Sequence, residues 1–230
     1  MKKTIVIIGA GPGVGFAVAE RFGKEGYNVA LLARNMEKLN MLKDDLRKKG
    51  IQAASFQADI LDRGHLTRSL LEVINYYGAI DVLEFSPTPT WESIRMARNI
   101  DVANEQHHLD YQVLAAIAAV QVVLPKMLER KDGSILFTTA SSAQNPVNRT
   151  ASFGVAAGAL LNYVRLLNMD LKEDNIYAGI VSIGALVISE NISESKGDFP
   201  EGMPTITAAE VADAHWNLHK QRDIAEIILS

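Results

Sequence analysis

The sequence contains no cysteine, only two tryptophans and no long apolar run at its start. Without cysteine there is no disulfide, no thiolate nucleophile and no zinc–thiolate site, and a reducing compartment is favoured. The apolar run that begins at Thr4 spans about five residues before glycines interrupt it, too short for a signal peptide or a membrane span. We therefore expect a cytoplasmic protein that is not inserted in a membrane.

The chain also lacks a strong charge of either sign. It has 23 Lys and Arg against 27 Asp and Glu, a formal charge of −4, and 48% apolar residues over 230 positions. This balance provides no general attraction to nucleic acid or to anionic lipid. A chain of this length is expected to fold as a single domain, residues 1–230, around one sheet.

Seven short runs rich in apolar and β-branched residues predict strands, and helical patterns lie between them. Such alternation implies right-handed crossovers and a parallel sheet that helices cover on both faces. The predicted fold class is therefore α/β, a Rossmann-type doubly wound sheet of about seven parallel strands. The predicted strands are Thr4–Ile8, Asn28–Leu32, Ala53–Gln57, Asp81–Phe85, Ser134–Thr138, Tyr177–Ile183 and Ile224–Leu229.

Two predicted helices, at about 102–128 and 152–171, are unusually long and apolar. A helix of this kind is buried in its own chain or packs on another subunit. We expect a homodimer or homotetramer that uses both helices. Towards the end of the chain, Thr207 and Glu210 form a capping box that starts the last helix. Residues 189–205 are rich in acidic residues, proline and glycine, and predict an exposed loop.

A glycine-rich stretch directly follows the first predicted strand and precedes an amphipathic helix. A turn of this type lets a dinucleotide pyrophosphate approach the backbone and the free N–H groups of a helix start. The spacing G-x-G-x-x-G fails because its third glycine falls on Val14, whereas G-x-x-x-G-x-G is met. We predict a nucleotide site that includes Gly9, Gly11, Gly13, Val14 and Gly15.

The end of the second predicted strand indicates which nucleotide is bound. An acidic residue there would bind the ribose 2′-hydroxyl, but the sequence has Arg34 followed by Asn35. A guanidinium suits a 2′-phosphate and can stack on adenine. We therefore predict NADP(H) in preference to NAD(H). A solvated loop arginine is the alternative.

These motifs resemble the short-chain dehydrogenase/reductase family, and the resemblance runs over nearly the whole chain. Asp59-Ile60 is similar to the family's Asp-hydrophobic pair at the adenine, and the residues from Val122 to Met127, VVLPKM, are similar to the end of its fourth helix. The family's Asn-Asn-Ala-Gly stretch at the cofactor pocket is replaced by Phe85-Ser86-Pro87-Thr88. The resemblance implies cofactor contacts at Asp59, Ile60, Ser86 and Pro87.

The same resemblance places the catalytic roles on residues that do not match. The family's proton-donating Tyr falls on Phe153, its Lys on Ala157, its Ser on Ala140 and its Asn on Gln112. No tyrosine in the sequence has a lysine four residues later. The weak candidates for a catalytic role are Ser141, Ser142, Tyr111 and Gln112.

The two neighbouring histidines, His107 and His108, are the obvious titratable pair, and a solvated helix face is the favoured interpretation of both. No cluster has convincing metal-ligand spacing. The leading hypothesis is an NADP(H)-binding pseudoenzyme or nucleotide sensor of this family. The alternative is an active NADPH-dependent oxidoreductase of a small carbonyl substrate with a non-standard site. A third hypothesis is a scaffold subunit in which Pro12 has weakened the glycine loop.

Overall fold

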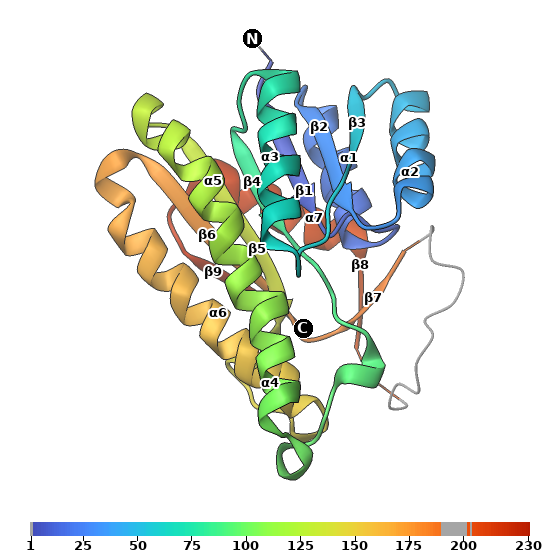
Figure 1. Ribbon diagram of the computed structural model, residues 1–230, viewed down its shortest axis with the longest axis vertical. Helices are drawn as coiled ribbons and strands as arrows, with labels where there is room; N and C mark the ends of the chain where they lie inside the picture. The colour runs from blue at the N-terminus through green and yellow to red at the C-terminus, as the bar shows by residue number, and fades with distance from the viewer. Residues whose placement is uncertain (1, 190–201, 203) are drawn as a thin grey trace.

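The computed structural model describes residues 2–189, 202 and 204–230. Seven strands form one sheet in the order β3-β2-β1-β4-β5-β6-β9, and every neighbouring pair is parallel (Figure 1). The strands are β1 (Thr4–Ile8), β2 (Asn28–Ala33), β3 (Ala53–Gln57), β4 (Val82–Phe85), β5 (Gly133–Ala140), β6 (Ile176–Ile183) and β9 (Glu226–Leu229). All seven predicted strands and the fold class are confirmed; β1 and β3 match at both ends, and the other strands differ by one or two residues at an end.

Helices cover both faces of this sheet, because alternate residues of each central strand are buried on opposite sides. One face packs on α1 (Val14–Lys24), α2 (Met36–Lys48) and α7 (Ala208–Gln221). The other packs on α3 (Arg63–Tyr77), α5 (Ala115–Arg130) and α6 (Ala151–Asp170). Within β1, for example, Ile5 and Ile7 pack on the first face, and Val6 and Ile8 on the second.

The long helix expected at 102–128 is continuous but not uniform. It consists of α4 (Val102–Leu109), a π-helical turn (Asp110–Leu114) and α5, and it ends at Arg130. A π turn inserts an extra residue into the helix and changes the direction of the side chains around it; such turns are frequent at functional sites. The π turn holds Gln112 and Tyr111, two residues singled out from the sequence.

Two helical segments, Val102–Arg130 and Asn148–Asp170, are long and apolar enough to cross a membrane by length and composition alone. Their mean hydropathies are 1.6 and 1.2. In this fold both lie along the sheet and bury one face in its core, as core helices of water-soluble proteins also do.

A second, two-stranded parallel sheet was not predicted. It pairs β7 (Leu186–Ile188) with β8 (Thr205–Thr207) next to the carboxyl edge of the main sheet (Figure 1). Thr205 therefore lies in a strand and not in the expected loop. Most of that loop, residues 190–201 and 203, lies outside the described residues. The capping box at the start of α7 is confirmed: the Thr207 hydroxyl accepts from Glu210 N, and the Glu210 carboxylate accepts from Thr207 N.

Candidate functional site

The glycine loop lies at the carboxyl edge of β1, between β1 and α1. Gly9 has a φ of +89°, a conformation that L side chains rarely adopt. A Cβ at Gly9 would lie 2.6 Å from the Pro87 nitrogen and 2.9 Å from the Ser86 carbonyl carbon. At Gly15 it would lie 3.1 Å from Ala10 Cα. Glycine is therefore required at Gly9 by its backbone angle and by the close approach of the chain after β4.

Helix α1 starts from this loop without a side-chain cap. Its N-cap residue is Gly13, which makes no capping hydrogen bond, and the first turn, including Val14, carries no acidic residue. The N–H groups of an uncapped helix start and the positive end of the helix dipole favour an anion. A distant residue also contacts the loop: the hydroxyl of Ser189, directly after β7, donates to the Pro12 carbonyl over 3.2 Å.

Arg34 follows β2 and is exposed, and its guanidinium forms no ion pair with the described residues. Its neighbour Asn35 is occupied differently: the Asn35 side chain caps α2 by accepting from Lys38 N over 2.9 Å. Of these two predicted cofactor residues, only Arg34 has a free side chain. The Asn35 side chain stabilises the helix that positions Arg34.

Tyr111 belongs to this end of the site and not to the expected position of the reacting atoms. Its hydroxyl donates to the Thr88 carbonyl over 3.1 Å. Burial raises its pKa, the positive charge of Arg34 lowers it and the negative charge of Asp59 raises it. Tyr111 therefore lies within electrostatic range of two residues predicted to contact the adenosine half. Ile60, next to Asp59, is 7% exposed.

Beneath the loop, a polar cluster around the fully buried side chains of Glu84 and His215 links β4, β5 and α7. The Thr138 hydroxyl bridges the two groups: it lies 3.0 Å from Glu84 Oε1 and 2.9 Å from His215 Nε2. Ser86, a predicted cofactor residue, donates its hydroxyl to Glu84 over 2.9 Å. Burial raises the pKa of Glu84 to about 8, and burial lowers the pKa of His215 to about 3.

Glu84 and His215 are therefore both neutral at pH 7, although His215 Nε2 and Glu84 Oε1 are only 4.0 Å apart. We do not regard the pair as a salt bridge, because burial disfavours both charged forms. The sequence interpretation missed this cluster. A glutamate inside the apolar run DVLEF of a central parallel strand is the signal that could have revealed it.

The four positions that correspond to the family's catalytic residues surround the start of α6. Phe153 and Ala157 lie on α6, and Ala157 is fully buried. Ala140 ends β5, and Gln112 is 4% exposed in the π turn. Helix α6 packs against both α4 and the π turn. The chain thus brings these positions together at one place, but none of the four carries a group that could donate or accept a proton in place of tyrosine.

The two weak serine candidates lie in the 3-10 turn that follows β5 and face different neighbours. A Cβ on Gly184 would lie 2.8 Å from the Ser141 hydroxyl, so Ser141 faces the end of β6. A Cβ on Gly154 would lie 3.5 Å from the Ser142 hydroxyl, so Ser142 faces α6. Ser142 is 7% exposed, and its hydroxyl oxygen has no hydrogen-bond partner among the described residues.

The prediction for His108 is wrong. His107 is exposed, as expected, but the His108 ring is fully buried, and its Nε2 lies 3.0 Å from the Ser93 carbonyl oxygen. The reason is tertiary: the segment 87–101 between β4 and α4 folds over this helix face. Among the described residues, no group of three or more His, Cys, Asp or Glu side chains could hold a metal ion.

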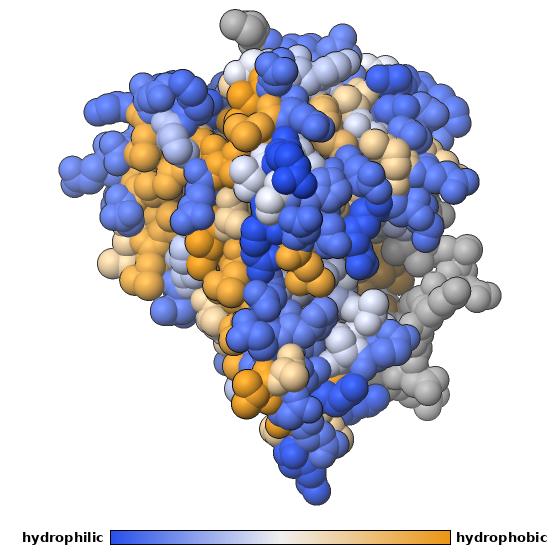
Figure 2. All heavy atoms as spheres, viewed as in Figure 1, coloured by the Kyte–Doolittle hydropathy of each residue, from blue (hydrophilic) through white to orange (hydrophobic). Residues whose placement is uncertain are grey.

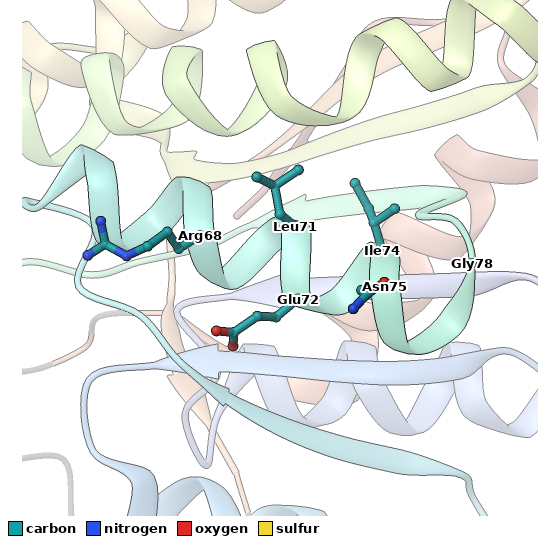
Figure 3. A pocket seen from close by; sticks show the side chains of 6 residues that line it. All are labelled: Arg68, Leu71, Glu72, Ile74, Asn75 and Gly78. Carbon is teal, nitrogen blue, oxygen red and sulfur yellow. The ribbon is translucent and has the colours of Figure 1, made fainter.

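A surface hollow lies elsewhere. It runs along α3 and is lined by residues of that helix and by its C-cap Gly78, and Figure 3 shows Leu71 and Ile74 pointing to the same side of the helix. A second hollow lies beside β3, between α2 and α3, where Gln57 donates to the Arg34 carbonyl. Neither hollow includes a glycine of the loop or a residue of α6, so the candidate site rests on the loop and helix geometry above.

Comparison with known proteins agrees with this geometry. Residues 3–196 match the family model described as short chain dehydrogenase. An uncharacterized oxidoreductase of Staphylococcus epidermidis is 24% identical over 213 residues, which cover 93% of this chain and 89% of that protein.

Solved structures share the fold at low identity. A 7α-hydroxysteroid dehydrogenase complexed with NADH has a TM-score of 0.88 at 22% identity and covers 99% of this chain and 92% of its own. An NADPH-bound short chain oxidoreductase from Pseudomonas aeruginosa PAO1, described as containing an atypical catalytic center, has a TM-score of 0.86 at 19% identity. The match covers 100% of this chain and 97% of that protein. On the family match over most of its length, this chain belongs to the short-chain dehydrogenase family.

Proposed function

We propose that this protein binds NADP(H) at the carboxyl edge of its sheet and acts on a small carbonyl or alcohol substrate through a site that differs from the family's usual one. The observation that carries the proposal is the cradle at Gly9. Its positive φ and its contact with Ser86-Pro87 leave no room for a side chain, and an uncapped helix start lies beside it. These features suit a pyrophosphate group.

The remaining cofactor contacts are assigned from position. Gly11, Gly13 and the N–H groups of Val14 and Gly15 would hold the pyrophosphate. Arg34 would pair with a 2′-phosphate, which is why we propose NADP(H) over NAD(H). Asp59, Ile60 and the Ser86-Pro87 wall would enclose the adenosine and its ribose. When bound, the nicotinamide supplies or accepts a hydride.

The relatives support a nicotinamide cofactor but not the choice between the two forms. The Pseudomonas oxidoreductase holds NADPH, and the steroid dehydrogenase holds NADH. The preference for NADP(H) therefore rests on Arg34.

Without the tyrosine and lysine, positioned acid–base catalysis by the usual residues is absent, which typically costs about 10²- to 10⁴-fold in rate. A nucleotide-binding pseudoenzyme or sensor is thus the second candidate function. We favour turnover because the buried side chains of Gln112 and Ser142 have polar atoms without a partner among the described residues. Both lie on elements that pack against α6, the helix that carries Phe153 and Ala157.

Calorimetric titration with NADPH and NADH tests nucleotide binding. We expect NADPH to bind more tightly, and Arg34→Glu to weaken NADPH binding by about 10- to 100-fold, because a charge-assisted contact is replaced by repulsion. Lys172→Glu is the matched control: it makes the same change of charge at the opposite edge of the sheet and should leave binding unchanged. If neither nucleotide binds near millimolar concentration, both nucleotide hypotheses are rejected in favour of a scaffold.

Turnover separates the two remaining functions. We propose assaying a panel of aldehydes, ketones, quinones and secondary alcohols. NADPH oxidation that disappears in Arg34→Glu supports an oxidoreductase. Tight nucleotide binding with no turnover across the panel supports the pseudoenzyme.

We further propose that the chain is one cytoplasmic domain that forms a homodimer or homotetramer through α4–α5 and α6. Large apolar side chains remain exposed on these helices, including Val155 (55%), Leu166 (56%) and Met169 (73%). Figure 2 shows apolar residues gathered over the side of the molecule where α5 and α6 lie. Covering such a surface with a second copy would remove it from water.

A further inference from the structure

Helix α4 and the π turn carry a stripe of polar side chains that faces inward. Asn104 and His108 are four residues apart in α4 and share one side of that helix, with Glu105 beside Asn104, and Gln112 follows in the π turn. Buried polar atoms are nearly always hydrogen-bonded in native proteins. Five side-chain atoms of this stripe are nevertheless buried without a partner among the described residues: Asn104 Oδ1, both Glu105 carboxyl oxygens, His108 Nδ1 and Gln112 Nε2.

The tautomer of His108 follows from its one hydrogen bond. The partner of Nε2 is the Ser93 carbonyl, 3.0 Å away, which can only accept. Nε2 therefore carries the hydrogen, and in the neutral ring Nδ1 carries the lone pair. Asn104 Nδ2 donates to the same carbonyl over 2.7 Å and holds it in place. His108 is thus an oriented base whose basic nitrogen has no partner among the described residues, the arrangement in which histidine accepts a proton.

The segment 87–101 connects this histidine to the start of α6. Two residues after Ser93, Arg95 N donates to the Ser152 hydroxyl over 2.9 Å, and Ser152 N donates to the Arg95 carbonyl over 3.2 Å. Ser152 directly precedes Phe153. Helix α4, which carries His108, packs against α6. The start of α6 lies at the carboxyl edge of the sheet, where α/β proteins bind ligands (Figure 1).

Two further polar atoms without partners among the described residues flank the same part of α6. The Ser142 hydroxyl faces Gly154 from the turn after β5, and Gln112 Nε2 lies one helical turn after His108. Together, His108 Nδ1, Gln112 Nε2 and Ser142 Oγ offer an acceptor, a donor and a hydroxyl that can do either. This set suits an oxygen atom that has to be oriented and to exchange a proton.

Glu105 and His107 lie on α4 itself, and the His107 ring centroid is 5.7 Å from that of His108. The Arg95 guanidinium is bonded to the Glu92 and Ile94 carbonyls, and Asp101 caps α4. The titratable side chains of the segment 87–101 are Glu92, Arg95, Arg98 and Asp101. The first turn of α6, residues 151–154, has no titratable side chain.

We propose that His108 is the acid–base group of this protein, in place of the missing tyrosine, and that Gln112 and Ser142 orient the substrate oxygen. In alcohol oxidation the substrate O–H proton passes to His108 Nδ1, the carbon gives its hydride to the oxidised nicotinamide, and a carbonyl remains. In reduction the imidazolium returns the proton to the oxygen. This inference rests on the proposed function.

Because the His108 ring is fully buried, we expect the proton to reach it through one bridging water. A general base can act through one water.

The test compares His108→Gln with His107→Gln, which removes the adjacent exposed histidine. Calorimetry with NADPH is done first on both variants and on the wild type. All three should bind equally, which also shows that the variants are folded. Failure of the wild type to bind would refute the proposed function and not the role of His108.

With nucleotide bound, His108→Gln should lower turnover of the best panel substrate by about 10²- to 10⁴-fold, whereas His107→Gln should not. His108→Gln should also remove an inflection from the pH profile of kcat. Equal kcat and equal pH profiles in wild type and His108→Gln would overturn the assignment, as would nucleotide binding without turnover of any panel member.

A second readout does not depend on activity. In protein labelled with ¹⁵N-histidine, one ring, absent from the His108→Gln spectrum, should show the neutral tautomer that carries its hydrogen on Nε2. Adding NADP⁺ and a secondary alcohol that is turned over should shift that Nδ1 resonance and leave the His107 signals in place. A protonated Nδ1 in the free protein, or no shift on addition, would contradict the proposal.

Discussion

Glu84 provides a test of the buried cluster beneath the glycine loop. Its carboxyl is fully buried, and burial raises its pKa from the ordinary 4.5 to about 8. Glu84→Gln replaces the carboxyl with a neutral group of the same shape, and its amide oxygen can still accept from Thr138. The folded wild type keeps a proton on Glu84 that the unfolded chain releases above pH 4.5. Stability from this group is therefore present below pH 4.5 and is lost as the pH rises towards 8.

The size of the effect follows from the two pKa values. A difference of one pKa unit between the folded and unfolded states corresponds to about 1.4 kcal/mol of stability. Between pH 5 and pH 8 the protonation difference of Glu84 therefore lowers the free energy of unfolding of the wild type by about 3 to 4 kcal/mol. His215 acts with the opposite sign: its pKa is lowered to about 3, so its stabilising contribution is present above pH 6.5 and is lost as the pH falls. That contribution is common to both proteins and cancels in their difference.

Urea unfolding of wild type and Glu84→Gln at pH 5, 6.5 and 8 measures this difference. Between pH 5 and pH 8, the free energy of unfolding of the wild type should fall by about 3 to 4 kcal/mol relative to that of Glu84→Gln. Thr138→Val removes a hydrogen bond that lowers the pKa of Glu84, so in this variant the loss of stability should continue to higher pH. A difference between wild type and Glu84→Gln that does not change with pH would refute a protonated, buried Glu84.

Three further outcomes are expected. Gly9→Ala should destabilise the fold by about 2 kcal/mol or more, measured by urea unfolding, because the new Cβ meets the Pro87 backbone and φ is positive; an unchanged midpoint would contradict the close approach. Thr207→Ala should cost about 1 kcal/mol through loss of the capping box, seen as a lower Tm; an equal Tm would mean that the cap is not formed. Leu166→Arg should convert the oligomer to monomer in sedimentation, and a monomeric wild type would reject the proposed interface.

Much of the fold could be predicted from local sequence. Central parallel strands are buried on both faces and therefore appear as apolar runs, and this is why all seven were found. The pair β7 and β8 was missed because each has three residues and they pair across a separation of 19 positions, from Leu186 to Thr205. Nothing local distinguishes such strands from loop.

The positions of the candidate site residues in the fold could be predicted where one element defines them. The glycine loop and Arg34 follow directly from the ends of β1 and β2. His108 was misplaced because a solvated helix face is the usual setting for neighbouring polar residues, and its burial depends on a segment some fifteen residues earlier in the chain. The spacing of Asn104, His108 and Gln112, every four residues, is the signal that could have raised the question.

The sequence by itself determined the alternation of strands and helices, the glycine-rich turn after β1 and the absence of the family's tyrosine and lysine at Phe153 and Ala157. These are properties of residue type and spacing, which do not depend on distant contacts. The tertiary structure alone decided which polar groups are buried together. Glu84 meets His215 across 131 positions, and His108 meets Ser93 only because the chain between β4 and α4 folds back. Burial and pairing of polar groups are set by contacts between elements that are far apart in the sequence, and they determine the chemistry that we propose.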